Sequence, residues 1–486
     1  MASSPQAPSL VWFRDDLRLA DHPALHAAVT RGAPLLCIYI FEEGDGLRAH
    51  GGASRWWLHH SLDALSRQIE QIGGRLDLLR GQASTIVPAL AAAAKAGAVF
   101  WNRRYGAAEI AVDAGIKSAL ARDGRHAESF NGALIHEPWE IRTKAGGAYG
   151  VYTPYWRAAL ALGDTAPILE APRALARAPY PASGPARAAL TDLDLLPRRP
   201  DWAAGLRLAW TPGETGARAR LDAFMQDDLA AYASARDMLA VAGTSRLSPH
   251  LRFGEISPRQ AAEAARHGVA NAPAARDGAQ KFLAELGWRE FNHHVMFHHP
   301  DVATQNLRAA FDRLPWRDLP RAELDAWKQG RTGCPIVDAG MRELWRTGTM
   351  HNRVRMIAAS FLVKHLLGDW RIGEAWFWDC LCDADPANNP MNWQWVAGTG
   401  TDASPFFRIF NPMLQGAKFD PNGDYVRRFV PELAGLPANV IHAPWTASAA
   451  VSERAGVRLG TSYPRPIVDH IWARDRALAI YAGIKG

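Results

Sequence analysis

The sequence predicts a fold in two parts: an α/β domain with a doubly wound, Rossmann-like parallel sheet, followed by an all-α domain. Over the first 132 residues, short apolar runs alternate with amphipathic stretches rich in Ala and Leu. This alternation is typical of a parallel sheet covered by helices on both faces. Beyond residue 213 the apolar positions follow helical spacing, without strand-like alternation of any length. The length of 486 residues also exceeds that of one ordinary domain.

Four apolar runs in the first part have the length of strands. They span residues 10–13, 35–40, 76–79 and 99–101, and amphipathic stretches such as residues 56–72 lie between them. In an open parallel sheet a ligand binds beyond the carboxyl ends of the strands. The polar segments 14–18 and 102–104 fall at such ends. We expect them either to face a ligand or to be solvated turns.

The middle of the chain reads as a connection between the two parts. Residues 165–213 are rich in Ala, Pro and Arg, which is typical of a long segment wrapped over a surface. We therefore expect an α/β domain over residues 1–132, a connector over 133–213 and a helical domain over 214–486. In the helical part Ser257, Pro258 and Gln260 predict an N-terminal capping box. Residues 281–299 and 337–346 have helical apolar spacing.

Composition narrows the class of protein. A net charge of +6 and a pI near 9.2 permit a polyanionic partner without requiring one. The four cysteines form no CxxC pair, so we expect inert thiols in a reducing cytoplasm. No apolar run is long enough to cross a membrane, and we expect a monomer.

Two patterns imitate ligand sites, and we assign neither of them. The histidines in 293–299 have metal-like spacing but lack the carboxylate of an HExxH motif, so no metal is expected. Residues 398–403 fit a relaxed dinucleotide fingerprint, yet no βαβ unit surrounds them.

The segment from Asp369 to Trp395 is the most informative in the chain. Seven of its 27 residues are the ones we single out, three indoles, three carboxylates and one amide: Trp370, Trp393, Trp395, Asp369, Asp383, Asp385 and Asn389. Buried carboxylates and amides must find partners. One interpretation is a polar loop between core helices. The other is a pocket for an aromatic redox cofactor.

Three weaker patterns point to a nucleotide-like ligand. Residues 244–248, with hydroxyls and one arginine before a helix, suit a pyrophosphate or an ordinary helix cap. Glu285, Trp288 and Arg289 share one helical face, which suits a nucleobase or an exposed ion pair beside a packed indole. In residues 350–356, Asn352, Arg355 and Met356 also share a face, with Arg353 turned elsewhere.

Together these segments make the chain similar to the photolyase/cryptochrome family over nearly its full length. The similarity rests on separated motifs in the order of that family: VWFRDDLR (11–18), GTSRLS (243–248), WREF (288–291), GCPIVDA (333–339), MHNR (350–353) and FRIFNP (407–412). Phe282 and Cys334 depart from the residues that many members carry, Trp and Tyr respectively.

The resemblance implies FAD held within the helical domain. Residues Tyr232, Thr244, Ser245, Arg246, Leu247 and Ser248 would hold the phosphates. Asn389 would face the flavin N5 atom. The remaining cofactor-binding residues would be Phe282, Arg289, Asn352, Arg355, Asp383 and Asp385. Trp393, Trp370 and Trp316 align with the family's electron-transfer tryptophans, and Trp345 would offer a branch.

The same resemblance implies light-driven repair of cyclobutane pyrimidine dimers in UV-damaged DNA, a carbon–carbon lyase activity. Asn389 is the residue that repairing members carry, and Asn352 and Met356 replace the histidines of (6-4) photolyases. Glu285, Asn389 and Met356 would be catalytic. The lesion and its flanking phosphates would contact Glu285, Trp288, Trp395, Asn352, Arg236, Arg289, Arg353 and Arg408.

Two questions stay open at this point. The segments 419–423 and 460–464 resemble plant cryptochromes, so a bacterial photolyase of the group nearest them (class III) would reconcile both sets of motifs. The alternative is a blue-light cryptochrome photoreceptor. A second, antenna chromophore is also implied, methenyltetrahydrofolate first and a deazaflavin second. Another flavin, or no antenna at all, stays open as well.

Overall fold

The computed structural model describes residues 6–163 and 167–485. By packing, the chain divides into two compact units. The first takes the residues up to 201 together with 210–229 and 245–300, and the second takes 202–209, 230–244 and the residues from 301 onward. The boundaries that we expect at residues 132 and 213 divide the chain into consecutive segments, whereas each packing unit combines separate segments. The predicted boundaries therefore stay a prediction.

A five-stranded parallel sheet organises the first unit, as the sequence predicts. Its spatial order is β3-β2-β1-β4-β5. The strands are β1 (Ser9–Phe13), β2 (Leu35–Glu42), β3 (Leu76–Gly81), β4 (Ala98–Asn102) and β5 (His126–Phe130). The four expected strands are confirmed. The fifth was missed because β5 is a half-exposed edge strand with the polar sequence HAESF, which has no apolar run.

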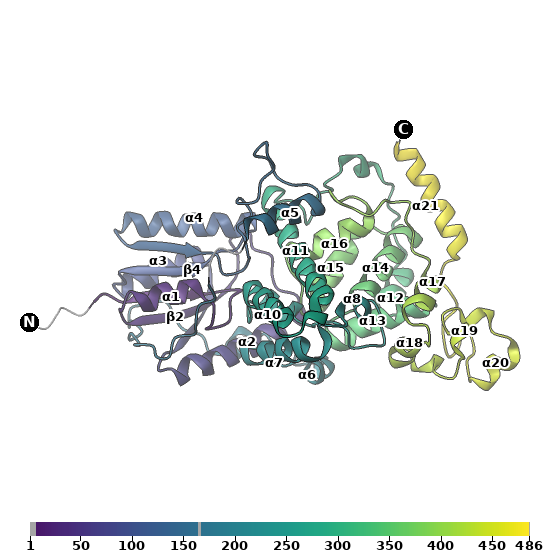
Figure 1. Cartoon of the computed structure of the whole chain (residues 1–486), viewed down its shortest axis with the longest axis horizontal. Helices are drawn as coiled ribbons and strands as arrows, with labels where there is room; N and C mark the ends of the chain where they lie inside the picture. Colours follow the sequence, from purple (N-terminus) through teal and green to yellow (C-terminus); the bar gives the residue numbers. More distant parts are fainter. Residues whose placement is uncertain (1–5, 164–166, 486) are drawn as a thin grey trace, which may run out of the picture. The chain divides into compact units, whose positions relative to one another are not determined.

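Helices cover both faces of the sheet (Figure 1). They are α1 (Pro23–Thr30), α2 (Gly52–Gln71), α3 (Ala83–Ala93) and α4 (Ala107–Arg122). Apolar residues of α3 and α4 pack with Trp12, Ile38 and Trp101 of the strands into one core cluster. Right-handed crossovers place α1 and α2 on the opposite face. The predicted doubly wound sheet is confirmed.

The connector lies along the sheet in the first unit. Beyond α5 (Tyr152–Leu162), its described residues up to 201 are irregular apart from a turn at Leu190–Leu193. Leu35 in β2 exchanges backbone hydrogen bonds with Ala176 and Ala178, at 2.7 and 2.9 Å. The Ala188 N–H donates to the Leu78 carbonyl of edge strand β3 at 2.8 Å. These bonds satisfy backbone groups that an open sheet leaves unpaired.

Helices complete the first unit. They are α7 (Glu214–Ala223), α9 (Ser248–Arg252), α10 (Pro258–Asn271) and α11 (Arg276–His298). The capping box is confirmed: the Gln260 N–H donates to Ser257 Oγ at 3.0 Å, and the Ser257 N–H donates to Gln260 Oε1 at 2.9 Å.

The second unit is helical over its described residues. Its helices are α6 (Ala204–Ala209), α8 (Tyr232–Ala235), α12 (Arg321–Lys328), α13 (Pro335–Thr347), α14 (Asn352–Ser360), α15 (Trp370–Cys380), α16 (Asn388–Ala397), α17 (Pro412–Phe419), α18 (Asp424–Phe429), α19 (Ala438–Ile441), α20 (Ala449–Arg454) and α21 (His470–Lys485). One core runs through it, with Trp327, Trp370 and Trp393 almost fully buried. Among the described residues, no helix has the length and apolarity that a membrane span requires.

Candidate functional site

The polar segments at the carboxyl ends of β1 and β4 form a buried network of hydrogen bonds and ion pairs. Arg14 makes a two-pronged ion pair with Asp113, at 2.7 and 3.1 Å, and the Trp101 indole donates to the same carboxylate at 2.8 Å. Asp16 accepts from Asn102 at 2.8 Å and lies 3.0 Å from a ring nitrogen of His22. The interpretation as solvated turns is wrong for these side chains, because Arg14, Asp16 and Asn102 are each 3 % exposed.

The Arg18 guanidinium also forms its hydrogen bonds within the first unit. Its guanidinium donates to the carbonyls of Ala20, Asp21, Gly132 and Gly254 at 2.7–3.0 Å, and the residue is fully buried. A buried arginine of this kind is stabilised only when its donors all find acceptors. Arg18 therefore connects the turn after β1 to Gly132 and Gly254 of the first unit, and these bonds use four of its five N–H donors.

Two of the three carboxylates singled out in the 369–395 segment, Asp369 and Asp385, cap helices. Asp369 accepts from the Arg371 N–H at 2.9 Å and begins α15. Oδ1 of Asp385 accepts from the N–H groups of Ala387 and Asn388, at 2.9 and 2.7 Å, just before α16. For Asp369 and for this oxygen of Asp385, the structural interpretation is sufficient.

Asp383 is different. Its Oδ2 accepts from Arg355 Nη2 at 2.9 Å, while its buried Oδ1 has no hydrogen-bond partner. Arg355 is held in place because its Nε donates to the Met350 carbonyl at 2.7 Å. A buried, unpaired carboxylate oxygen is costly, so it marks a place where a hydroxyl or N–H of a ligand belongs. The residues here fit the polar edge of a cofactor such as FAD.

Asn389 is oriented by Glu374. The Asn389 Nδ2 donates to the Glu374 backbone carbonyl at 3.0 Å and to its carboxylate at 2.8 Å. Both partners are acceptors, so the amide nitrogen is fixed on that side and the amide oxygen points the other way. The side chain therefore presents an acceptor for a ligand N–H. The sequence did not single out Glu374, and its position inside the 369–395 segment was the available signal.

The three predicted relay tryptophans all belong to the second unit's core or pack against it. Trp393 is 2 % exposed and lies edge-on to Phe377 and Trp327, with ring centroids 4.9 and 6.2 Å away. Trp370 is fully buried and its indole donates to Asn306 at 2.9 Å. Gly373, three residues after Trp370, leaves the room that the Trp393 ring occupies. Trp316 is partly buried at the edge of this core.

A second row of indoles reaches the surface. Trp345 is 54 % exposed and stacks on Trp376 with a centroid distance of 6.1 Å and an interplanar angle of 2°. Trp202 lies 6.5 Å from Trp345, and the Lys328 ammonium lies 4.7 Å from the Trp376 ring centroid. The sequence named Trp345 alone. Trp376 stands on α15, six residues after Trp370, and that shared helix was its signal.

Helix α11 presents the predicted lesion-contacting residues of the first unit. Glu285 pairs with Lys281 at 3.0 Å, so the alternative of a Glu285–Arg289 pair is wrong. Trp288 is stacked face to face on Tyr152, with centroids 3.8 Å apart and an interplanar angle of 11°. The Tyr152 hydroxyl donates to the Ala284 carbonyl at 2.6 Å, which locks this pair. Tyr152 lies in no recognisable motif, so sequence reasoning missed it.

Arg289 and Glu290 face the body of the first unit. Arg289 donates to the Ala133 carbonyl at 2.8 Å and its side chain is 13 % exposed. Glu290 accepts from the Ile135 and His136 N–H groups at 2.8 and 3.2 Å. Burial raises the pKa of Glu290 to about 7, against the opposing effects of Arg289 and the two N–H groups. Arg289 thus fixes a loop, and its role toward cofactor and DNA stays a prediction.

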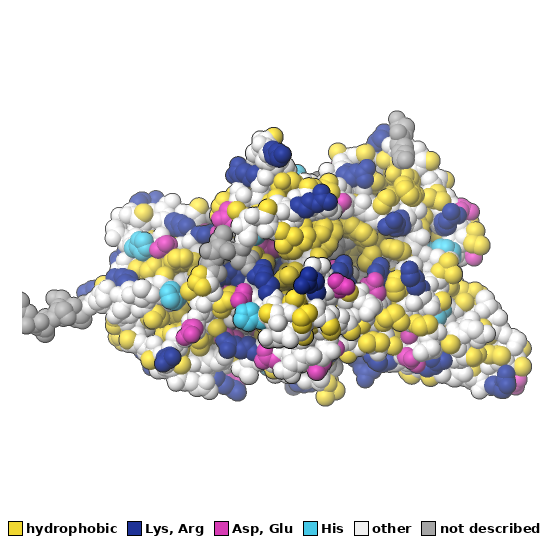
Figure 2. All heavy atoms as spheres, in the orientation of Figure 1, with side chains coloured by type: hydrophobic (Ala, Val, Ile, Leu, Met, Phe, Trp, Pro, Cys, Tyr) yellow, Lys and Arg dark blue, Asp and Glu magenta, His cyan; other side chains and the backbone are white. Residues whose placement is uncertain are grey.

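The predicted phosphate-contacting arginines of the second unit differ in their freedom. Arg353 donates to Asp237 at 2.7 Å, and Arg236 lies 3.9 Å from the same carboxylate. Arg408 is exposed, and its backbone carbonyl accepts from Lys364 at 2.9 Å. On the face drawn in Figure 2, Lys and Arg side chains of this unit form separate spots. The basic side chains on this face therefore do not form one continuous patch.

The other predicted residues divide between the units. In the first, Arg220 donates to the Ser245 carbonyl at 2.8 Å and Phe282 packs on Phe224 at 5.0 Å. Arg246 has a positive φ of 52° and lies 4.3 Å from the Trp210 ring. Leu247 and Ser248 begin α9. The second unit holds Tyr232, Thr244, Asn352, Met356 and Trp395.

Comparisons with known proteins agree with this arrangement. A model described as "DNA photolyase" matches residues 9–176, and one described as "FAD binding domain of DNA photolyase" matches residues 282–483. The chain is 52 % identical over 479 residues to a deoxyribodipyrimidine photo-lyase of Agrobacterium fabrum, covering 99 % of this chain and 98 % of that protein. It is 38 % identical over 478 residues to cryptochrome-2 of Arabidopsis thaliana, covering 96 % of this chain and 77 % of that protein.

Solved structures of photolyases and cryptochromes also superimpose on this chain. The crystal structure of a bacterial class III photolyase from Agrobacterium tumefaciens superimposes with a TM-score of 0.95 at 51 % identity, covering 100 % of this chain and 99 % of that chain. The structure of a cryptochrome from Synechocystis superimposes with a TM-score of 0.88 at 30 % identity, covering 98 % of this chain and 100 % of that chain.

Proposed function

Because this chain belongs to the DNA photolyase/cryptochrome family, we propose that it is a deoxyribodipyrimidine photo-lyase. Its substrate is the cyclobutane pyrimidine dimer in UV-damaged DNA, and light drives the reaction. The observation that carries the proposal is the α14–α16 region, with an oriented amide at Asn389 and an unpartnered carboxylate oxygen at Asp383. The 52 % identity to a photo-lyase over nearly the whole chain supports it.

Bound FAD supplies the photoexcited electron that splits the dimer. Asp383 would accept a hydrogen bond from FAD, and Arg355 keeps the Asp383 side chain in position. Asn389 would offer its amide oxygen to an N–H group of the flavin, because Glu374 holds the other end of the amide. The hydroxyl-rich segment 244–248, with Tyr232, binds the pyrophosphate. Phe282, Asn352 and Asp385 complete the cofactor contacts.

Aromatic, acidic and basic side chains bind the lesion. Trp288, whose ring Tyr152 holds from one side, and Trp395 pack against the flipped dimer. Glu285 stabilises the reacting dimer through a hydrogen bond, and Met356 contacts it. Arg236, Arg289, Arg353 and Arg408 bind flanking phosphates, so affinity falls as salt rises. A poorly stacked lesion is easier to flip than an intact base, which contributes to selectivity.

Trp393, Trp370 and Trp316 form the relay that reduces oxidised FAD in light. Their packing in one core supports this role. The stacked pair Trp345 and Trp376 supports a branch, because Trp345 is exposed to external reductants.

An antenna chromophore, methenyltetrahydrofolate or else a deazaflavin, broadens the light that the enzyme uses. An absorption spectrum of the purified protein, before and after flavin bleaching, distinguishes the two. We also propose that the protein is a monomer and that it is located in the cytoplasm. Four buried cysteines that form no disulfide bond support the location.

The function is tested with an oligonucleotide that carries one thymine dimer. Illumination of the FAD-loaded protein is expected to remove the dimer, and incubation in the dark is not. Glu285→Ala is expected to lower repair per absorbed photon by roughly tenfold or more while changing lesion affinity less, as a residue that acts in the transition state should. Glu453→Ala, which changes an exposed glutamate of α20, is the matched control. A wild-type protein that leaves the dimer intact in light is instead a photoreceptor.

A further inference from the structure

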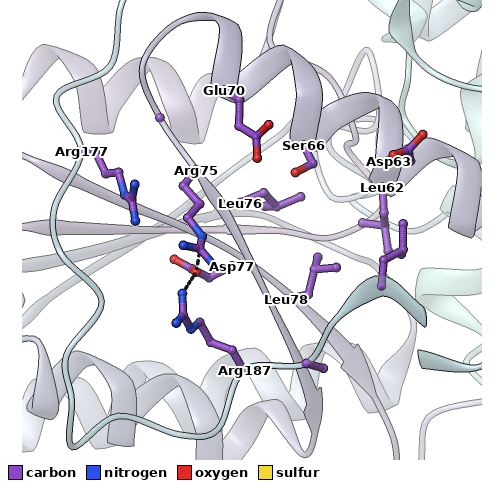
Figure 3. Close-up of a pocket in the computed structure, with 13 residues that line it drawn as sticks. Leu62, Asp63, Ser66, Glu70, Arg75, Leu76, Asp77, Leu78, Arg177 and Arg187 are labelled. Atoms are coloured by element: carbon purple, nitrogen blue, oxygen red, sulfur yellow. Dashed lines mark hydrogen bonds and ion pairs between the residues drawn. The ribbon is translucent and has the colours of Figure 1, made fainter. Parts of the chain in front are cut away.

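A cavity of about 470 Å³ opens in the first unit at the beginning of strand β3 (Figure 3). Its walls come from the second half of α2, the first residues of β3 and the connector. This volume is typical of sites for small molecules. The cavity lies at the amino end of β3, whereas ligands of open parallel sheets bind at the carboxyl ends. It is therefore separate from the position that the sheet topology itself predicts.

Three arginines form one side of the cavity. Asp77 is 3 % exposed and accepts from Arg75 Nε at 3.0 Å and from Arg187 Nη1 at 3.1 Å. Each bond uses one of five guanidinium donors, so both arginines keep donors for a ligand. Arg177 makes no side-chain hydrogen bond or ion pair with the residues that the structure describes. Three guanidinium groups around one concave surface favour an oxyanion such as phosphate.

The opposite wall is formed by acceptors on α2. Asp63, Ser66 and Glu70 line the cavity at positions i, i+3 and i+7 of the helix. Asp63 pairs with Arg67 at 2.6 Å. Within the described part of the chain, Ser66 and Glu70 have no side-chain partner, and Figure 3 shows both on α2, across from the arginines. Free carboxylate and hydroxyl oxygens of this kind accept hydrogen bonds from ligand hydroxyls.

A purely structural role explains only part of this arrangement. Arg187 and the Ala188 N–H tie the connector to β3, through Asp77 and the Leu78 carbonyl. That clamp requires neither the unpaired Arg177 nor the unpaired Glu70. We propose that this cavity binds a small phosphorylated polyol. Arg75, Arg177 and Arg187 hold its phosphate, and Ser66 and Glu70 hold its hydroxyls.

The test is calorimetric titration of the full-length, FAD-loaded protein with inorganic phosphate, ribose 5-phosphate and ribose. Ribose 5-phosphate is expected to bind saturably, about tenfold or more tighter than inorganic phosphate, and ribose to show no binding at concentrations up to about 1 mM. Arg177→Gln is expected to weaken ribose 5-phosphate binding by roughly tenfold, because it removes one charged donor. Glu70→Gln should reduce the affinity for ribose 5-phosphate to that for phosphate.

Arg122→Gln, at an exposed arginine at the end of α4, is the matched control and should bind like the wild type. Dimer repair by each variant confirms that it is folded, because the cavity has no part in the proposed reaction. Absence of saturable ribose 5-phosphate binding overturns the proposal, as does unchanged binding by Arg177→Gln. Equal affinities for phosphate and ribose 5-phosphate overturn the assignment of Ser66 and Glu70 to ligand hydroxyls.

Discussion

The carboxyl edge of the sheet and the α14–α16 region contain the same residue types but differ in how their carboxylates are bonded. At the sheet edge, both oxygens of Asp113 accept hydrogen bonds, from Arg14 and from the indole of Trp101, and the buried atom without a partner is Arg14 Nε. Around α14–α16, Arg355 and Asp383 are also paired, yet one buried oxygen of Asp383 has no partner. A carboxylate with both oxygens bonded stabilises the fold, and one with a buried, unpaired oxygen indicates a ligand. Residue type alone does not distinguish the two.

The largest expected effects come from removing one carboxylate in each region. Asp113→Asn leaves the buried Arg14 guanidinium without a counter-charge and should lower the free energy of unfolding by about 3 kcal/mol, with FAD content per folded protein unchanged. Asp383→Asn should instead lower FAD affinity by roughly tenfold or more. Chemical denaturation and flavin absorbance measure the two outcomes. If Asp113→Asn lost FAD while its stability stayed at the wild-type value, Asp113 would not be the structural carboxylate that this comparison makes it.

The stability of the protein is expected to depend on pH through the Glu290 carboxyl group. Its pKa in the folded protein is about 7 and its ordinary value is 4.5, so between these pH values the folded state binds more protons than the unfolded state. Stability therefore falls as pH rises through this window. Relative to Glu290→Gln, the wild type should lose on the order of 3 kcal/mol between pH 4.5 and 7. Parallel unfolding curves for both proteins at several pH values measure the difference, and a constant difference would rule out the raised pKa.

A substitution at Gly373 tests the packing of the predicted relay residue Trp393 in the α15–α16 core. A Cβ at this position overlaps the Trp393 ring, so Gly373→Ala should displace that indole and cost about 1–3 kcal/mol of stability. It should also slow the photoreduction of oxidised FAD, as Trp393→Phe does if Trp393 is the first relay residue. Repair by pre-reduced Trp393→Phe should stay near the wild-type rate. Loss of both activities in Trp393→Phe would contradict the relay.

The smallest expected effect is a difference between Arg408 and Arg353 of the second unit in the salt dependence of DNA binding. Arg408 is exposed, so Arg408→Ala should lower the slope of log affinity for damaged DNA against log salt by about one unit. Arg353 already pairs with Asp237, so Arg353→Ala should change the slope less. Fluorescence anisotropy at several salt concentrations gives both slopes. A larger change for Arg353→Ala would mean that DNA displaces Asp237.

The periodicity of the sequence was sufficient for most of the fold. Apolar runs located four strands, and Ser257 with Gln260 located a helix start, because these features depend on neighbours along the chain. The polar edge strand β5 lacked such a signal. In the candidate site, the sequence identified Asp383, Arg355 and Asn389 but not Glu374 or Tyr152. Those two act through residues 15 and 136 positions away, Asn389 and Trp288.

By itself, the sequence determined the class of each part and the family, since these follow from local patterns and from the order of motifs along the chain. It also predicted the residues that carry the chemistry, and these stay a prediction. The tertiary structure decided which polar groups form hydrogen bonds with one another and which remain for a ligand. It bonded both oxygens of Asp113 to Arg14 and Trp101 and left Asp383 with an unpaired oxygen. Hydrogen-bond satisfaction is a property of groups that meet in space, and their separation along the chain does not encode it.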